Sequence, residues 1–105
     1  MQINRSPRYK KNLFQILDYI AQDKVSASEN FLNELDKLIN NLSNSPFKFR
    51  KSEYFDDKNI RDMIYKGCTV IYRVNKTKNT IDIVRIFHKN KPPLKDTKKQ
   101  IPPSD

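Results

Sequence analysis

Residues 60–88 read IRDMIYKGCTVIYRVNKTKNTIDIVRIFH, and this stretch decides the fold. It contains three runs rich in β-branched and aromatic residues, Ile60 to Tyr65, Cys68 to Val74 and Thr80 to His88. Such residues favour strands, and the polar links between the runs are short enough to join antiparallel neighbours. The stretch therefore predicts three consecutive antiparallel strands. The only glycine of the chain, Gly67, falls in the first link, where we expect a turn that needs positive φ.

Alternation assigns faces to the second and third strands. In the second strand one side, which we expect to meet the helices, carries Cys68, Val70, Tyr72 and Val74. The third strand is apolar on both sides, because one side carries Ile81, Ile83 and Phe87 and the other carries Val84 and Ile86. This pattern is typical of a central strand. Two helices can cover only one face of the sheet, so we expect the other face to meet a partner or a loop.

Two amphipathic helices are predicted upstream, after a short strand at residues 2–5. Ser6 followed by Pro7 is typical of a helix start, and we end this helix near Asp23. A capping box at Ser26 to Glu29 predicts the start of the second helix, and Asn44-Ser45-Pro46 ends it. The apolar stripes are Leu13, Ile16, Leu17, Ile20 and Ala21 in the first helix and Phe31, Leu35, Leu38, Ile39 and Leu42 in the second.

The remaining segments carry no clear period. Residues 47–58 mix aromatic and charged side chains and are predicted to form a loop. Residues 89–105 hold four of the six prolines, five lysines and two aspartates, so we expect a mobile basic tail. The predicted organisation is α+β, with one domain at residues 1–88 in the order β-α-α-β-β-β, and with the helix hairpin packed on one face of a small, mainly antiparallel sheet.

Composition points to a basic cytoplasmic protein. The 105 residues carry 21 Lys and Arg against 12 Asp and Glu, a net charge of +9, of which the tail contributes +3 and residues 1–88 contribute +6. Such a balance favours nucleic-acid phosphates or an acidic partner. The single cysteine, Cys68, suits a reducing compartment, and we expect no metal site and no cofactor because no Cys/His cluster exists. No apolar run is long enough for a membrane span or a signal peptide.

Short motifs in a fixed order resemble the RelE/ParE superfamily of toxins from type II toxin–antitoxin systems. The matching motifs, which span residues 2 to about 91, are Asp18-Tyr19-Ile20-Ala21, Asn44-Ser45-Pro46, Asn59-Ile60-Arg61, 67–74 (GCTVIYRV) and 83–88 (IVRIFH). The resemblance implies a compact toxin fold, a cognate antitoxin that wraps the toxin, and a gene pair that stabilises plasmids or slows growth. A basic surface and an exposed apolar sheet face are what an antitoxin segment that folds on binding would cover.

The resemblance leaves the mode of action open between two kinds of toxin. RelE-type toxins cut messenger RNA on the ribosome with basic residues on the sheet, but this chain has Ile60, Asp62 and Thr69 where those residues would stand. Toxins similar to YoeB and YafQ use a histidine at the end of the last strand. His88 could serve as a general acid or base in that way. The neighbours that would steady a phosphate are Arg73, Arg85, Lys89 and Lys91.

We interpret the chain as a ParE-like toxin that acts by binding, with DNA gyrase as the target that the resemblance implies and with no catalytic residue required. The residues that we expect to contact the target or partner are Arg61, Arg73, Arg85, His88, Lys89 and Lys91. The first alternative is a metal-independent endoribonuclease that acts on messenger RNA or the ribosome through His88, Arg85 and Arg73. The second is a small basic nucleic-acid-binding protein that uses the loop aromatics Phe47, Phe49 and Tyr54.

Overall fold

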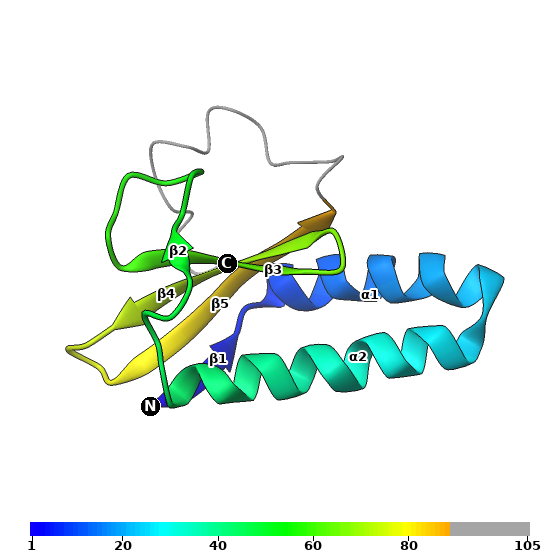
Figure 1. Cartoon of the computed structure of the whole chain (residues 1–105), viewed down its shortest axis with the longest axis horizontal. Helices are drawn as coiled ribbons and strands as arrows, with labels where there is room; N and C mark the ends of the chain where they lie inside the picture. Colours follow the sequence, from blue (N-terminus) through cyan, green and yellow to red (C-terminus); the bar gives the residue numbers. More distant parts are fainter. Residues whose placement is uncertain (89–105) are drawn as a thin grey trace.

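The computed structural model describes residues 1–88 as a five-stranded sheet with a helix hairpin on one face (Figure 1). The elements are β1 (Gln2–Arg5), α1 (Pro7–Asp23), α2 (Val25–Asn40), the 3₁₀ turn η1 (Asn41–Ser43), β2 (Arg50–Lys51), β3 (Ile60–Tyr65), β4 (Cys68–Asn75) and β5 (Thr80–His88). The predicted α+β class and order of elements are confirmed, with the two-residue strand β2 as an addition. The predicted tail, which includes Lys89 and Lys91, lies outside the described residues.

The sheet has the strand order β1-β5-β4-β3-β2, so β5 lies inside it as expected. β1 pairs in parallel with the first half of β5, and all other pairs are antiparallel. Gly67 has φ +78° and Lys66 has φ +46°, which together make the two-residue turn with positive φ that the β3–β4 hairpin needs. The chain thus begins and ends its described part on neighbouring strands.

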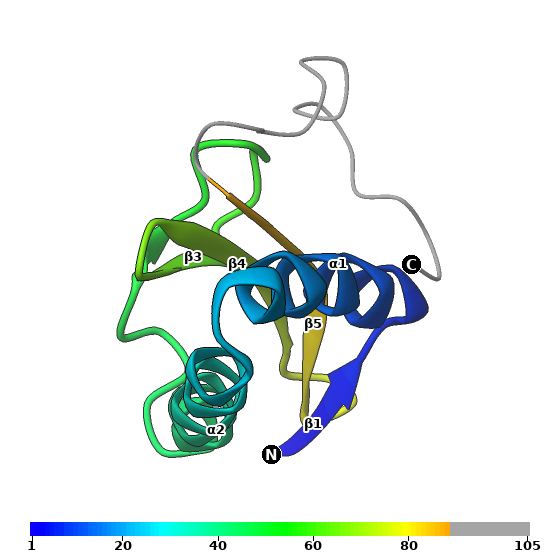
Figure 2. The same ribbon diagram turned by 90° about the vertical axis from the view of Figure 1, so that its right-hand side faces the viewer.

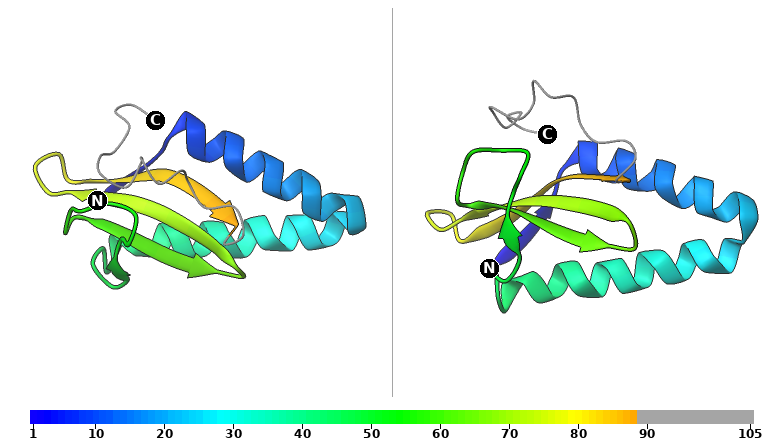
Figure 3. Two further views of the ribbon diagram at one scale, coloured as in Figure 1. Left: turned by 90° about the horizontal axis from the view of Figure 1, so that it is seen from above. Right: turned by 45° about the horizontal axis from the view of Figure 1, so that its top comes forward.

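Both helices lie on the same side of the sheet, and the turn between them extends past its end (Figures 2 and 3). The apolar stripes face inward and join the strands in one core. Its fully buried members include Leu35, Ile39 and the two tyrosines Tyr9 and Tyr72, whose burial raises the pKa of both phenols to about 12. The predicted side of β4 that begins with Cys68 does meet the helices.

The start of α1 agrees with the prediction from the sequence, and the start of α2 does not. Ser6 caps α1 as predicted, because its Oγ accepts a hydrogen bond from the Tyr9 amide at 3.0 Å. The prediction of a capping box at Ser26 to Glu29 was wrong. α2 begins at Val25, and its N-cap Lys24, which is also the C-cap of α1, makes no side-chain cap. A single extended residue joins the helices, so packing of the hairpin fixes the turn in place of a cap.

A β-bulge in β5 changes which side chains face the helices. Ile71 of β4 lies opposite Arg85 and Tyr72 lies opposite Ile83, so Val84 is an extra residue on the β5 side. Beyond the bulge the alternation shifts by one position. Ile86 consequently packs in the helix-side core and Phe87 packs on the other face, the reverse of the assignment from regular alternation.

The segment predicted as a loop at residues 47–58 contains β2, which pairs with β3 at the sheet edge. The chain then turns over the face away from the helices, where Phe55 joins Ile60, Ile71 and Val84 in a second apolar cluster. Phe55 is only 3% exposed. A loop of this chain therefore covers part of the face for which we expected a partner or a loop.

Candidate interaction face of the sheet

The face of the sheet turned away from the helices carries three rows of side chains across β3, β4 and β5. Residues paired in register point to the same side of a sheet, so each row can be read from the strand pairing. The rows are Ile60–Arg73–Asp82, Asp62–Ile71–Arg85 and Ile64–Thr69–Phe87. We call this surface the open face. It presents one charged end, a buried middle and an apolar end that lies beside the Lys66-Gly67 turn.

The three arginines that were expected to contact the target or partner are divided between the two faces. Arg73 and Arg85 lie on the open face. Arg61 lies opposite Tyr72, which packs against the helices, so it belongs to the other side. Arg73 forms a half-exposed ion pair with Asp82 at 3.5 Å, and Arg85 is only 7% exposed. The open face therefore presents one accessible arginine of these three, and that arginine is already paired.

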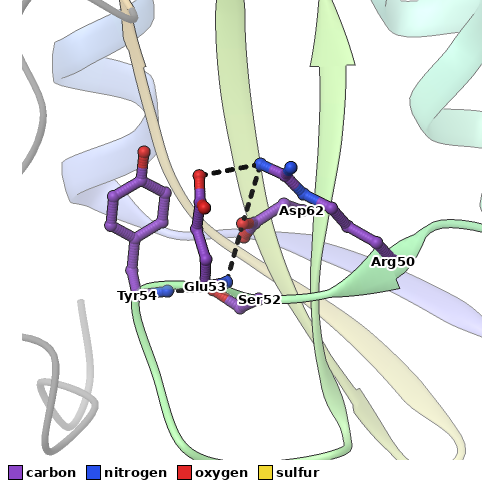
Figure 4. A network of polar contacts seen from close by, with 5 residues as sticks. All are labelled: Arg50, Ser52, Glu53, Tyr54 and Asp62. Atoms are coloured by element: carbon purple, nitrogen blue, oxygen red, sulfur yellow. Dashed lines mark hydrogen bonds and ion pairs between the residues drawn. The ribbon is translucent and has the colours of Figure 1, made fainter.

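Asp62 holds the covering loop in place through a small polar network (Figure 4). Its Oδ2 accepts the Glu53 amide at 3.1 Å and lies 3.6 Å from the Arg50 guanidinium, which also contacts Glu53 at 3.0 Å. The Ser52 hydroxyl accepts the Tyr54 amide, which tightens the same turn. Burial raises the pKa of Asp62, while Ser52, the Glu53 amide and Arg50 oppose that rise.

The sequence did not indicate which loop residues cover the open face, and Tyr54 was considered only as a candidate nucleic-acid-binding aromatic. Tyr54 meets Phe87 edge-on with ring centres 5.1 Å apart, and Phe55 is buried beneath it in the second cluster. An aperiodic segment gave no signal for this packing. The one available hint was an aromatic pair, Tyr54-Phe55, in a stretch otherwise rich in charge.

His88 lies apart from the open face. It pairs in register with Cys68, whose side chain packs in the helix-side core, and it is exposed at the end of β5. Arg73 is five positions from Cys68 along β4, or roughly 17 Å at the ordinary rise of a strand, and it points to the other side. The structure therefore does not bring His88 and Arg73 together.

Other candidate chemistry is limited in the described part of the chain. Cys68 is buried, and burial raises the pKa of its thiol, which disfavours the reactive thiolate. Among residues 1–88 no group of three or more His, Cys, Asp or Glu side chains could hold a metal ion. None of the described helices is long and apolar enough to cross a bilayer.

Comparison with known proteins agrees with the observed architecture. A family model described as the ParE toxin of a type II toxin–antitoxin system, parDE, matches residues 3–93. The chain is similar to a structure from the chromosomal ParDE toxin–antitoxin system of P. aeruginosa, with 17% identity and a TM-score of 0.69 over 84% of this chain and 95% of that one.

A second solved structure, a conserved hypothetical protein of Helicobacter pylori, shares 19% identity and has a TM-score of 0.51 over 86% of this chain and 96% of its own. At such identities the two solved structures show a common fold. No curated protein matched the chain.

Proposed function

The chain belongs to the ParE toxin family of type II toxin–antitoxin systems, and from this premise we propose that it inhibits growth by binding a target such as DNA gyrase until a cognate antitoxin neutralises it. The setting is the bacterial cytoplasm, and the gene pair stabilises a plasmid or slows growth. The proposal requires a surface that recognises a protein and no catalytic group.

The separation of His88 from Arg73 and Arg85 is the observation that favours binding over RNA cleavage. A nuclease that uses histidine as acid or base needs the histidine and the cations that stabilise the phosphate around one reacting atom. Here His88 and Arg73 lie on opposite faces, and Arg85 is buried. Asp62 adds a carboxylate to the open face where a phosphate would need positive charge.

The apolar end of the open face supports binding of the antitoxin. Ile64 is 51% exposed there, and the half-buried Phe87 lies in the same row with Thr69 between them. Exposed apolar side chains grouped on one surface mark places that partners cover. His88, which we expected at a partner interface, is exposed on the other side of the sheet. We assign His88 to the target and the apolar row to the antitoxin.

The test compares DNA supercoiling by gyrase with cleavage of naked and ribosome-bound RNA, using the purified full chain. We expect loss of supercoiling, no RNA cuts, and rescue by added antitoxin. The His88→Ala variant should keep inhibition within a few-fold, because it removes one rim contact. A nuclease that uses His88 would instead lose on the order of a hundredfold of its activity in that variant.

Each variant is first checked for folding by denaturant unfolding and for binding to the antitoxin, so that loss of activity is not loss of structure. Specific RNA cuts that disappear in His88→Ala would overturn the proposal in favour of the endoribonuclease. Intact RNA together with unaffected supercoiling would keep the toxin family but exclude gyrase as the target.

A further inference from the structure

We propose that the corner of the molecule around Phe47 binds the phosphate backbone of duplex nucleic acid. This corner lies where β2, β3 and the β4–β5 turn meet on the helix side of the sheet. Its members are Phe47, Lys48, Phe49, Lys51, Arg61 and Lys76, which we call the Phe47 corner. The inference does not depend on the proposed function and concerns residues outside the open face.

Aromatic rings hold the cations of this corner in place. The Arg61 guanidinium lies 4.9 Å from the centre of the Phe47 ring, and the Lys76 ammonium lies 5.1 Å from the same centre. Lys48 lies 5.4 Å from the Phe49 ring. Attraction to the ring quadrupole orients a cation without neutralising its charge. The two cations on Phe47 are therefore no more than about 10 Å apart and both keep their full charge.

The backbone fixes the rest of the corner. Arg61 donates from Nη1 to the Phe49 carbonyl and from Nε to the Lys58 carbonyl, both at 3.1 Å. Lys51 is the register partner of Arg61, so its side chain leaves β2 on the same side. The Tyr72 hydroxyl donates to the Pro46 carbonyl at 2.8 Å and anchors the chain immediately before Phe47.

No carboxylate of the described residues 1–88 forms an ion pair with these cations. Among residues 1–88, the ion pairs of Arg5, Arg50, Lys66 and Arg73 all have acidic partners, whereas Lys48, Lys51, Arg61 and Lys76 form none. The nearby Glu53 and Asp62 are engaged by Arg50, whose side chain leaves β2 on the opposite side. Four uncompensated cations on one corner form a site for a polyanion.

The character of the donors favours nucleic acid over an acidic protein. The fork of Arg61 that would grip a carboxylate is already engaged by two carbonyls, and the other three cations are lysines, which act on phosphate as point charges. The corner offers no large exposed apolar anchor, which a protein interface requires at its centre. The ring of Phe47 is occupied by cations, so it gives no platform for an unstacked base, and a duplex is preferred to a single strand.

The experiment measures fluorescence anisotropy of a labelled random-sequence DNA duplex of about 20 base pairs with the purified full chain across 50–200 mM NaCl. We expect a plot of log K against log salt with a slope of about −3 to −4, as four neutralised phosphates require. The double variant Lys48→Gln/Lys76→Gln should lower the magnitude of that slope by about 2. The matched control Lys10→Gln/Lys11→Gln removes the same charge from the exposed side of α1 and should leave the slope nearly unchanged.

Two further measurements separate the geometry of the corner from net charge. Phe47→Leu keeps the charge and the apolar bulk, so it should weaken duplex binding several-fold while urea unfolding shows that the variant is folded. Equal losses in the corner and control variants, or absence of binding by the unaltered chain at 50 mM NaCl, would overturn the proposal. So would a polyglutamate peptide that competes as well as duplex of equal charge, or a single strand that binds more tightly.

Discussion

Asp62 is the residue on which the covering loop depends. It sits in the middle of the open face with its side chain fully removed from solvent, and its Oδ2 is bound by the loop. Its other oxygen, Oδ1, has no hydrogen-bond donor in the described part of the chain. A buried carboxylate oxygen without a donor costs stability in its ionised form. The same residue therefore orders the loop and weakens the fold at neutral pH.

Asp62→Asn should consequently change how stability depends on pH. The pKa of Asp62 is raised in the folded chain, so the folded chain binds this proton more readily than the unfolded chain. Ionisation of Asp62 therefore lowers the stability of the fold at pH values above the folded pKa. This loss of stability disappears as the pH falls toward the ordinary pKa of 3.8. The unfolding free energy of the variant minus that of the parent should be larger at pH 7 than at pH 4, by on the order of 1 kcal/mol. Urea unfolding at both pH values measures it.

The control for this prediction is Asp82→Asn, which removes a carboxylate from the half-exposed pair with Arg73. Exposed pairs contribute about 0–1 kcal/mol, so this variant should change stability little at either pH. A difference between pH 7 and pH 4 in Asp62→Asn no larger than that in Asp82→Asn would contradict the assigned role of burial.

At the scale of elements, Ser6 connects the start of α1 to the bulge in β5. Its Oγ accepts from the Tyr9 amide and donates to the Val84 carbonyl at 2.8 Å, while its own amide donates to the Ile83 carbonyl at 3.0 Å. A bulge leaves a backbone group outside the regular ladder, and here the capping serine satisfies it. One side chain thus sets both where the helix begins and how it sits on the central strand.

Ser6→Ala should therefore cost more than an ordinary helix cap. Loss of an N-cap costs about 0.5–2 kcal/mol, and the Val84 carbonyl loses its donor at the same time, so we expect a loss near 2 kcal/mol in urea unfolding. Ser26→Ala is the matched control, because Ser26 is exposed in the first turn of α2 and makes no cap. Equal effects of the two substitutions would show that Ser6 acts as a surface residue.

The elements differ in how far they could be predicted. The start of α1, its end at Asp23 and the three meander strands carry strong local signals, namely Ser6-Pro7, apolar periodicity and the Gly67 turn, and all were predicted. The false capping box at Ser26 shows the limit of a motif when tertiary packing fixes the helix start. The bulge at Val84 could not be predicted, because the strand is apolar on both sides. The faces of Ile86 and Phe87 were therefore predicted the wrong way round.

The candidate site was less predictable than the elements, because it depends on strand register and on contacts between distant segments. Arg61, Arg73 and Arg85 lie on three adjacent strands, but register and the bulge decide the face on which each one lies. The network of Asp62 joins β3 to a segment without periodicity, and such non-local contacts leave no short-range pattern. The loop aromatics Phe47 and Phe49 were candidates for nucleic-acid binding, and the sequence could not show that cations lie over their rings.

The whole molecule presents two unlike surfaces on either side of one sheet edge. The open face ends in an apolar row with the half-exposed Ile64, and the Phe47 corner carries uncompensated positive charge. A partner that covers the first need not cover the second. We therefore expect the antitoxin and a nucleic-acid backbone to be able to bind at the same time.

Ile64→Gln tests the assignment of the open face to the antitoxin. An exposed substitution should change stability by no more than about 0.5 kcal/mol. Loss of a central apolar contact in an interface costs about 1–2 kcal/mol, or about 5- to 30-fold in Kd. Calorimetric titration with the antitoxin measures the difference. Val25→Gln, an exposed apolar residue at the turn of the helix hairpin, is the control. Weaker binding of the Val25 variant alone would move the antitoxin to the helices.

The parallel pairing of β1 with β5 sets the order in which the protein can be completed during its synthesis. Contacts between the two strands join residues 78 positions apart, as in the hydrogen bond from Asn4 to Asp82. At a ribosomal rate of roughly 5–20 residues per second, β1 waits about 4 to 16 seconds for its partner to be made. The bond from Ser6 to Val84 waits equally long. The two helices can pair early, but the sheet that carries the open face closes only when β5 is available. A nascent chain interrupted before that point cannot assemble this surface.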